Sequence, residues 1–211
     1  MGKVTGAIVF SLWAGAAWAE PVTIAALGDS LTQGYGLPVE QGFVPQLEAW
    51  LEDAGHDVDI INAGVSGDTT QGGLSRMAWT LTPEVDAMIV TLGGNDLLRG
   101  IAPEVSRANL EGILQAARDA DVEVLVVGME APGNYGPDYK QAFDAMYPDI
   151  AQSFDTLYAE SFFAGLGGPD TAPSDVQNFM QPDGIHPNAE GVARIVEGLA
   201  PSVQALIARV E

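Results

Sequence analysis

The sequence of 211 residues contains no cysteine, which excludes disulfide bonds, thiolate nucleophiles and cysteine-ligated metal sites. It contains only two histidines, His56 and His186, so a catalytic zinc site is hard to build and we expect no metal. Any reaction that needs an imidazole base must use one of these two side chains. Without disulfides, the fold depends on its hydrophobic core, and a content of 47% hydrophobic residues is enough for a single domain.

Basic residues are also scarce. There are 8 Lys and Arg against 29 Asp and Glu, which gives a formal net charge of -21. Such a chain repels nucleic acid and anionic membrane surfaces, and we expect neither as a partner. The acidic residues are scattered along the sequence, which favours a solvated surface over an acidic binding module.

Long hydrophobic runs are absent beyond the N-terminus. Lys3 is followed by the uncharged, largely apolar stretch 4–16 and by Ala17-Trp18-Ala19, a pattern typical of a secretory signal peptide. The alternative is a membrane anchor, but the apolar stretch is shorter than the ~20 residues that a spanning helix needs. We therefore expect cleavage after Ala19, a mature domain of residues 20–211 in the periplasm or medium, and no stable membrane anchor.

The mature sequence alternates short apolar runs with helical patterns. Continuous apolar strands separated by helices predict βαβ units, a parallel sheet of about five strands and helices on both faces. The expected strands are 22–27, 58–61, 87–92 and 122–128, with a weak fifth at 154–158. The expected helices are 42–54, 70–77, 103–120, 138–153 and 188–210, the last kinked or restarted at Pro201; residues 160–181 form one long irregular region.

Three well-known motifs are missing. The chain has no G-x-S-x-G nucleophile elbow, no G-x-G-x-x-G after the first strand and no G-x-x-x-x-G-K-[ST]. These absences give no support to an α/β-hydrolase elbow, to dinucleotide binding or to a P-loop. We expect no organic cofactor.

Polar groups in small-residue turns follow three of the expected strands. They are Gly28-Asp29-Ser30, Asn62-Ala63-Gly64 and Gly93-Gly94-Asn95-Asp96. In an open parallel sheet, ligands bind outside the carboxyl ends of the strands. These turns therefore predict a site at that edge.

A serine nucleophile needs an adjacent base. His186 lies in Asp183-Gly184-Ile185-His186-Pro187-Asn188, with Pro187 expected at the first position of the last helix. Asp183 is close enough in sequence to hold the imidazole, which would leave its other nitrogen free to take the proton of Ser30. A plain turn and helix cap is the alternative for this segment, and His56 is expected to be a solvated bystander.

Acyl transfer also requires hydrogen-bond donors for an oxyanion. The backbone N–H groups of Ser30 and Gly64 and the side-chain amide of Asn95 are the candidates. The simpler alternative makes Gly93 and Gly94 turn residues and Asn95 a helix cap.

Four blocks of the sequence together are highly specific. G-D-S-L (28–31), N-A-G-V-S-G-D-T-T (62–70), G-G-N-D (93–96) and D-G-I-H-P-N (183–188) resemble the SGNH/GDSL hydrolase superfamily over essentially the whole mature chain. The L-R-G after G-G-N-D, N-Y-G (134–136) and F-M-Q-P-D-G-I-H-P-N (179–188) look like its periplasmic arylesterase, acyl-CoA thioesterase I and lysophospholipase branch. The resemblance implies a flavodoxin-like three-layer α/β/α sandwich.

The resemblance also implies roles for individual residues. Ser30 would be the nucleophile, His186 the base and Asp183 its orienting carboxylate, with Ser30, Gly64 and Asn95 in the oxyanion hole. The implied activity is a serine esterase or thioesterase acting on small-molecule or lipid esters, and we expect a monomer or a weak oligomer. The alternatives are a carbohydrate O-deacetylase and, from another class, a non-catalytic acidic binding protein on this fold.

The expected wall of the acyl site is modest. Candidates on the loops after the third and fourth strands are Leu97, Leu98, Ile101, Met129 and Tyr135. The segment 130–133, Glu-Ala-Pro-Gly, stands where a more hydrophobic lip would favour long chains, so we expect short and medium acyl groups.

Other polar and aromatic residues receive structural interpretations. Ser66 and Asp68 are expected to cap the helix after the second strand, and Asp29 and Asp96 to form turn hydrogen bonds, with Asp96 able to support the Asn95 loop. Trp50, Trp79 and the pair Phe162-Phe163 are expected in the core.

Overall fold

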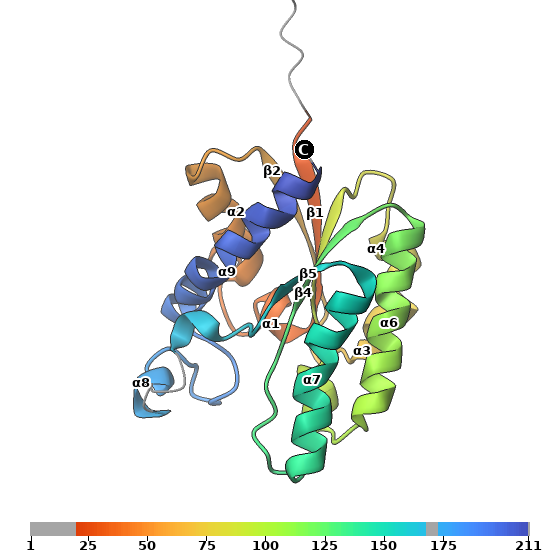
Figure 1. The fold of residues 1–211 in the computed structure, drawn as a ribbon. Helices are drawn as coiled ribbons and strands as arrows, with labels where there is room; N and C mark the ends of the chain where they lie inside the picture. The colour runs from red at the N-terminus through yellow and green to blue at the C-terminus, as the bar shows by residue number, and fades with distance from the viewer. Residues whose placement is uncertain (1–19, 168–172, 211) are drawn as a thin grey trace, which may run out of the picture.

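A computed structural model describes residues 20–167 and 173–210 of the chain (Figure 1). The predicted signal peptide, residues 1–19, lies outside the described residues. A five-stranded sheet forms the centre, with strand order β2-β1-β3-β4-β5 and every neighbouring pair parallel. Its strands are β1 (Val22–Gly28), β2 (Val58–Gly64), β3 (Ala87–Thr91), β4 (Glu123–Val127) and β5 (Leu157–Ala159).

The burial of each strand follows from its place in the sheet. β3 lies between β1 and β4 and is buried at all five positions, as its unbroken sequence Ala-Met-Ile-Val-Thr predicts. β2 lies at an edge, and exposed residues follow buried ones along it. Continuous apolar runs therefore identified the central strands.

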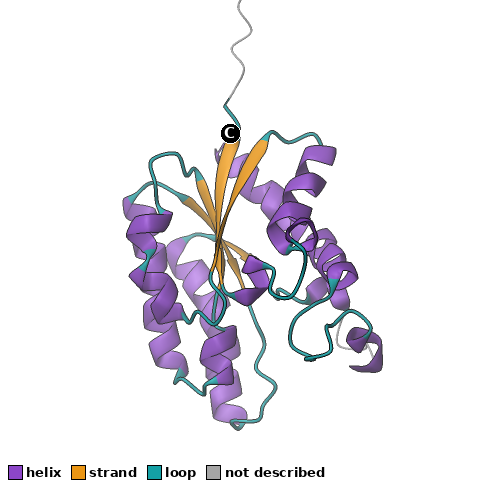
Figure 2. Cartoon of the chain, turned by 180° about the vertical axis from the view of Figure 1, so that it is seen from behind, coloured by secondary structure: helices purple, strands orange, loops and turns teal. Residues whose placement is uncertain are grey.

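Helices cover both faces of the sheet (Figures 1 and 2). The helices α2 (Phe43–Asp53) and α9 (Ala189–Val210) pack together on one face, and α3 (Thr70–Ser75), α6 (Pro103–Asp119) and α7 (Pro137–Phe154) pack together on the other. α6 shows the cause, since Leu110, Ile113, Leu114 and Ala117 recur at helical spacing and are all buried. This arrangement confirms the predicted three-layer α/β/α fold.

Two predicted boundaries were wrong. The helix expected over 70–77 breaks at Arg76 into α3 and α4 (Met77–Thr80), because the Arg76 guanidinium is tied to the carbonyls of Ala63 and Gly28 at the strand ends. The fifth strand begins at Leu157, since α7 extends to Phe154 and ends at Asp155 in the left-handed conformation, with φ 57°.

The last helix also differs from the prediction. It begins at Ala189, because the side chain of Asn188 accepts a hydrogen bond from Gly191 N (2.9 Å) as a cap. Pro187 instead pairs with Met180 in an antiparallel bridge. The helix continues through Pro201 as one element; that residue is exposed, while Ala200 and Val203 beside it are anchored in the core.

By length and composition alone, α9 is apolar enough to cross a membrane, contrary to our expectation for the mature chain. Nine of its residues are buried, and it packs against α2 and β4. Its apolar content is thus that of a core helix.

Of the remaining expectations, some are confirmed and others are wrong. The described parts of the region expected to be irregular, 160–167 and 173–181, contain two short helices, η2 (Ala164–Leu166) and α8 (Pro173–Gln177). Phe162 is fully buried and Trp50 and Phe163 pack against the core as expected, but Trp79 is 83% exposed. Trp79 lies on the four-residue helix α4, which has room to bury only Met77 and Thr80.

Candidate active site

Ser30 is presented by a sharp turn at the carboxyl end of β1. It is the first residue of α1 (Ser30–Gln33), and Asp29 caps that helix. Gly28 is required there, because a Cβ would clash with the side chain of Thr32 and lie 3.0 Å from the carbonyl oxygen of Thr91. The turn therefore brings a half-buried serine hydroxyl to the sheet edge where ligands bind.

The structure brings Ser30, His186 and Asp183 together. The distance from His186 Nε2 to Ser30 Oγ is 2.8 Å, and from His186 Nδ1 to Asp183 Oδ2 it is 2.7 Å. Asp183 Oδ1 also accepts hydrogen bonds from the backbone N–H groups of His186 (3.0 Å) and Ile185 (2.9 Å). The three side chains form one continuous hydrogen-bonded chain.

Hydrogen bonds determine the charge of Asp183. The backbone N–H of His186, then its imidazole and then the backbone N–H of Ile185 lower the pKa of Asp183 to about 2. An ionised carboxylate can only accept, so Nδ1 of His186 carries its proton and Nε2 accepts one from Ser30 Oγ. This is the tautomer that a general base requires.

A local framework holds His186 in place. Gln181 N donates to His186 O (2.7 Å), and Gln181 Nε2 donates to the carbonyl oxygens of Tyr35 (2.8 Å) and Pro187 (3.0 Å). The ring of Tyr35 packs against the imidazole, with 4.6 Å between centroids. Sequence reasoning missed Gln181 and Tyr35, which lie 146 positions apart and share no local pattern.

Asn95 lies on α5 (Gly94–Leu98), at the carboxyl end of β3. Its Nδ2 donates to Asp29 Oδ2 (3.0 Å), and the second hydrogen of the same amide remains for a ligand. Both Asn95 and Ser30 line the pocket beside the triad.

Gly64 does not join this site. Its N–H donates to Asn62 Oδ1 (3.0 Å), and it is absent from the pocket wall. A Cβ at Gly64 would clash with the backbone of Gln33, so the glycine allows β2 and α1 to approach closely. Gly67 lines the pocket instead, in a turn with φ 81°. The sequence feature that could have identified Gly67 is that it is the second glycine of N-A-G-V-S-G (62–67).

The turn around Gly67 is held by side chains. Arg99 Nη2 donates to the carbonyl of Gly67 (2.7 Å), and Ser66 Oγ donates to Gln33 Oε1 (2.8 Å). Asp68 pairs with Arg76 at 2.8 Å. The expected capping by Ser66 and Asp68 was thus wrong; Thr69 caps α3 by accepting from Gly72 N.

Asp96 is a buried hub next to Asn95. Its carboxylate accepts hydrogen bonds from Thr70 N (2.9 Å), Thr70 Oγ1 and Ser106 Oγ (2.9 Å). Asn109 Nδ2 adds a bond to Thr70 Oγ1 (3.0 Å). These contacts attach α5 to α3 and α6, so Asp96 supports the Asn95 loop through long-range bonds and not through a turn.

The pocket has a volume of about 350 Å³ and mostly apolar walls. Of the five expected wall residues, Leu97, Leu98 and Met129 line it, whereas Ile101 and Tyr135 do not. The Tyr135 ring packs on Gly100, outside the pocket. The wall also contains Leu31, Tyr35, Phe163 and Ile185, which sequence reasoning missed, and the carboxylate of Glu130.

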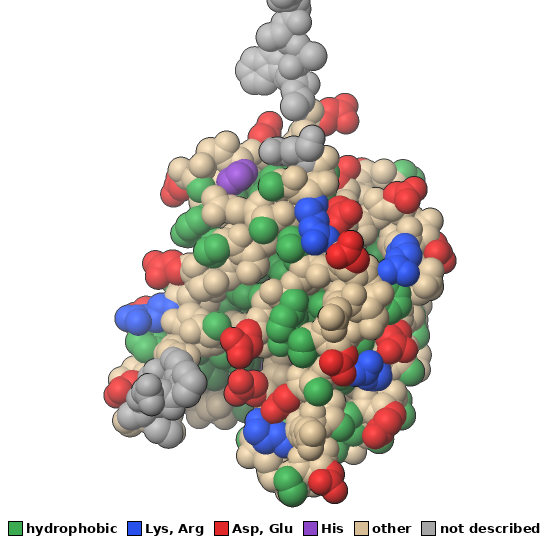
Figure 3. Space-filling model, in the orientation of Figure 1, with side chains coloured by type: hydrophobic (Ala, Val, Ile, Leu, Met, Phe, Trp, Pro, Cys, Tyr) green, Lys and Arg blue, Asp and Glu red, His purple; other side chains and the backbone are tan. Residues whose placement is uncertain are grey.

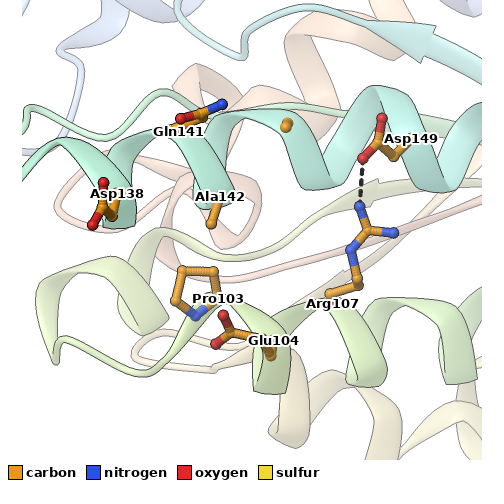
Figure 4. A pocket seen from close by; sticks show the side chains of 8 residues that line it. Pro103, Glu104, Arg107, Asp138, Gln141, Ala142 and Asp149 are labelled. Carbon is orange, nitrogen blue, oxygen red and sulfur yellow. Dashed lines mark hydrogen bonds and ion pairs between the residues drawn. The ribbon is translucent and has the colours of Figure 1, made fainter.

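A larger hollow of about 470 Å³ lies between α6 and α7 (Figure 4). Glu104, Asp138 and Asp149 face it, and Asp149 is paired with Arg107 at 2.6 Å. Its lining contains no serine or histidine that could act as nucleophile or base. The candidate nucleophile and base therefore both lie at the smaller pocket, which Ser30 and His186 line.

His56 lies just before β2, at the amino-terminal ends of the strands and away from the pocket. It is half-buried, and its Nε2 lies 3.1 Å from Gln204 Nε2. It is therefore a bystander to the pocket, although it is not the solvated side chain that we expected.

Comparison with known proteins supports one family. Residues 26–194 match the model of the GDSL-like Lipase/Acylhydrolase family. The chain is 39% identical to Esterase TesA of Pseudomonas aeruginosa over 186 residues, 88% of this chain and 89% of TesA. It is 35% identical to Thioesterase 1/protease 1/lysophospholipase L1 of Escherichia coli, covering 88% and 85% of the two chains. A crystal structure of TesA superposes with a TM-score of 0.79 at 39% identity, covering 87% of this chain and 99% of that one.

Proposed function

The chain belongs to the GDSL-like lipase/acylhydrolase family, and on that basis we propose that it is a serine esterase that hydrolyses carboxylic esters of short and medium acyl groups. The observation that carries this proposal is the unbroken hydrogen-bonded chain from Ser30 through His186 to Asp183. The names esterase, arylesterase and thioesterase among its relatives support the same class of reaction.

The proposed reaction begins with attack of Ser30 Oγ on the ester carbonyl carbon. His186 Nε2 takes the hydroxyl proton, and Asp183 stabilises the imidazolium. The tetrahedral intermediate collapses as the C–O bond to the alcohol breaks, and the imidazolium gives its proton to the leaving oxygen. Water then attacks the acyl-enzyme with His186 again as base, which releases the acid and restores Ser30.

We propose that the negative oxygen of the intermediate is held by Ser30 N, Gly67 N and Asn95 Nδ2. Gly67 replaces Gly64 in this role, because Gly64 N is bonded to Asn62 Oδ1 and Gly67 lines the pocket. Within the part of the chain that the structure describes, Gly67 N donates to no other group, which leaves it available to the oxyanion.

The apolar wall favours an acyl or aryl group over an acetylated sugar. Leu97, Leu98, Met129, Phe163 and Ile185 offer a surface that a polar carbohydrate would not match. The limited volume favours short and medium chains, and the enzyme needs no cofactor in this scheme.

A panel of p-nitrophenyl esters from acetyl to palmitoyl, with acetylated xylan alongside, tests the proposal. We expect the highest kcat/KM at short to medium chains and loss of activity in Ser30→Ala. An optimum on acetylated xylan, with little hydrolysis of butyryl or hexanoyl esters, would favour the O-deacetylase. Full activity in Ser30→Ala would reject the mechanism.

We further propose that the protein is exported, is cleaved after Ala19 and acts as a monomer or weak oligomer without an anchor. The Lys3, apolar stretch and Ala-Trp-Ala pattern supports export. N-terminal sequencing of protein recovered from the periplasm or medium should begin at Glu20, and size-exclusion chromatography should give a mass near that of one chain. Recovery of Met1 in that material would contradict cleavage.

A further inference from the structure

We propose that Asp29 is the positioning residue of the oxyanion hole: its two carboxylate oxygens fix the Ser30 turn and the Asn95 amide at the same time. The inference rests on the proposed function. It concerns a residue that the catalytic scheme above leaves without a role.

The geometry assigns each oxygen of Asp29 to a different donor. Oδ1 accepts from Leu31 N (3.0 Å), which closes the turn that contains the Ser30 N–H. Oδ2 accepts from Asn95 Nδ2 (3.0 Å), on a residue 66 positions away. One side chain thus connects the turns after β1 and β3, and each of these turns supplies an oxyanion donor.

The bond to Asn95 determines which end of its amide faces the pocket. An amide can rotate by 180° and present either NH2 or oxygen. Because both oxygens of Asp29 act as acceptors in the structure, Asp29 retains the orientation of the amide with Nδ2 toward it. The second hydrogen of Nδ2 is then available to the oxyanion, whereas the flipped amide would place an acceptor near a negative oxygen.

Capping of α1 does not explain the choice of aspartate. A serine, threonine or asparagine also caps a helix, and Thr69 does so for α3 with a hydroxyl. Asp29 is only 2% exposed, and burial raises its pKa against the lowering effect of its hydrogen bonds to Leu31 and Asn95. A buried carboxylate therefore stands where a neutral cap would be less costly, which favours a function that needs two acceptor oxygens.

Asp29→Asn tests this role directly. The new amide has one acceptor, so it can hold Leu31 N or Asn95 Nδ2 but not both. We expect kcat for p-nitrophenyl butyrate to fall roughly 10²-fold, within the range for loss of one oxyanion donor, and KM to change less than about threefold. The fall belongs in kcat because these bonds strengthen in the transition state.

The matched control is Asp86→Asn. Asp86 also accepts a hydrogen bond from a backbone N–H (Thr23, 2.9 Å), but at the opposite edge of the same sheet. This variant should keep its kcat. If circular dichroism shows that Asp29→Asn folds poorly, Asp29→Ser is a second test. The serine hydroxyl can still cap α1, but it is too short to reach Asn95. The kcat of Asp29→Ser should therefore fall as well.

A double variant separates positioning from a direct effect on His186. If Asp29 acts through Asn95, adding Asp29→Asn to Asn95→Ala should lower kcat far less than it does alone. Two results would overturn the inference. One is a double variant in which the two fold-losses of kcat multiply, and the other is a kcat for Asp29→Asn within about threefold of the unmodified protein. If Ser30→Ala is inactive in the same assay, either result rejects only the role of Asp29 and leaves the proposed esterase mechanism standing.

Discussion

Ser30 and His186 lie 156 residues apart in the sequence but share one hydrogen bond. The coupling between the two side chains can be measured with a double variant. Two residues that act in the same step lose their joint contribution when either is removed. Asp183 is hydrogen-bonded to the same histidine, so in the proposed mechanism its ionisation affects the same step.

The first prediction concerns this coupling. Ser30→Ala and His186→Ala should each lower kcat/KM by about 10²–10⁴. The double variant should be little worse than either single one, because members of a triad act as a unit. His56→Ala is the control and should retain near-normal activity. Multiplicative losses in the double variant would show that the two side chains act in separate steps.

The second prediction concerns pH. The pKa of Asp183 is lowered to about 2, so its ionised form is favoured in the folded protein and is lost only as the pH falls toward that value. Between about pH 4 and 8, Asp183 stays ionised, so its carboxyl should contribute no proton to the acid limb of kcat/KM. An NMR titration in which the Asp183 carboxyl takes up its proton above about pH 4 would contradict this assignment.

At the scale of elements, the site is a set of turns at the carboxyl ends of β1, β2 and β3 together with the segment before α9. Their glycines have different tasks. Gly64 permits close packing on α1, whereas Gly67 adopts φ 81° in the pocket wall, and a Cβ there would lie 3.7 Å from its nearest neighbour, Arg99 Nη2. Gly64 therefore serves packing, whereas Gly67 is available for the proposed oxyanion hole.

The third prediction compares alanine substitutions at Gly64 and Gly67, with Gly55 as the control. Gly64→Ala should destabilise the fold by several kcal/mol, since its Cβ meets the backbone of Gln33. Gly67→Ala should cost about 1 kcal/mol through its positive φ, and as the turn relaxes its N–H should leave the oxyanion site, lowering kcat roughly 10²-fold. Urea unfolding and kcat measure the two effects.

Gly55→Ala is the control for this comparison. Gly55 also has a positive φ, 94°, with no neighbouring atom within 4 Å of a Cβ, and it lies at the other end of β2. It should show a similar small loss of stability and an unchanged kcat. If Gly64→Ala retained stability but lost kcat, the assignment of Gly67 as donor would be wrong.

At the scale of the whole molecule, the net charge is strongly negative. Without residues 1–19 the balance is 7 basic against 29 acidic residues, or -22. On the face shown in Figure 3, acidic side chains are scattered among few basic ones. Glu130 adds a carboxylate to the pocket wall. This field disfavours approach of anionic substrates such as acyl-CoA.

The fourth prediction is a dependence on salt. Since ions screen charge over about 30 Å at 0.01 M and about 8 Å at 0.15 M, kcat/KM for butyryl-CoA should rise several-fold as salt is added. The uncharged ester p-nitrophenyl butyrate should show little change, and Glu130→Gln should weaken the effect for butyryl-CoA. A decrease of kcat/KM for butyryl-CoA with salt would mean that a local basic patch guides the substrate.

Patterns within short stretches of the sequence were enough to establish the layers, the parallel sheet and the edge at which to look for a site. Unbroken apolar runs such as 87–91 signal buried strands, and the spacing of Leu110, Ile113 and Ala117 signals a buried helix face, because both patterns are local consequences of burial. The composition also reduced the possible bases to two histidines. Four motif blocks identified the family.

Which further groups complete the site around Ser30, His186 and Asp183 became clear only in the folded chain. Gly64 and Gly67 are three residues apart and equally plausible as donors, and the choice depends on the hydrogen bond from Gly64 N to Asn62 and on the packing of α1. The contact of Asp29 with Asn95, the support from Gln181 and the pocket wall at Phe163 and Ile185 join distant segments. Such contacts have no local signature in the sequence, because they arise when the turns at the strand ends come together in three dimensions.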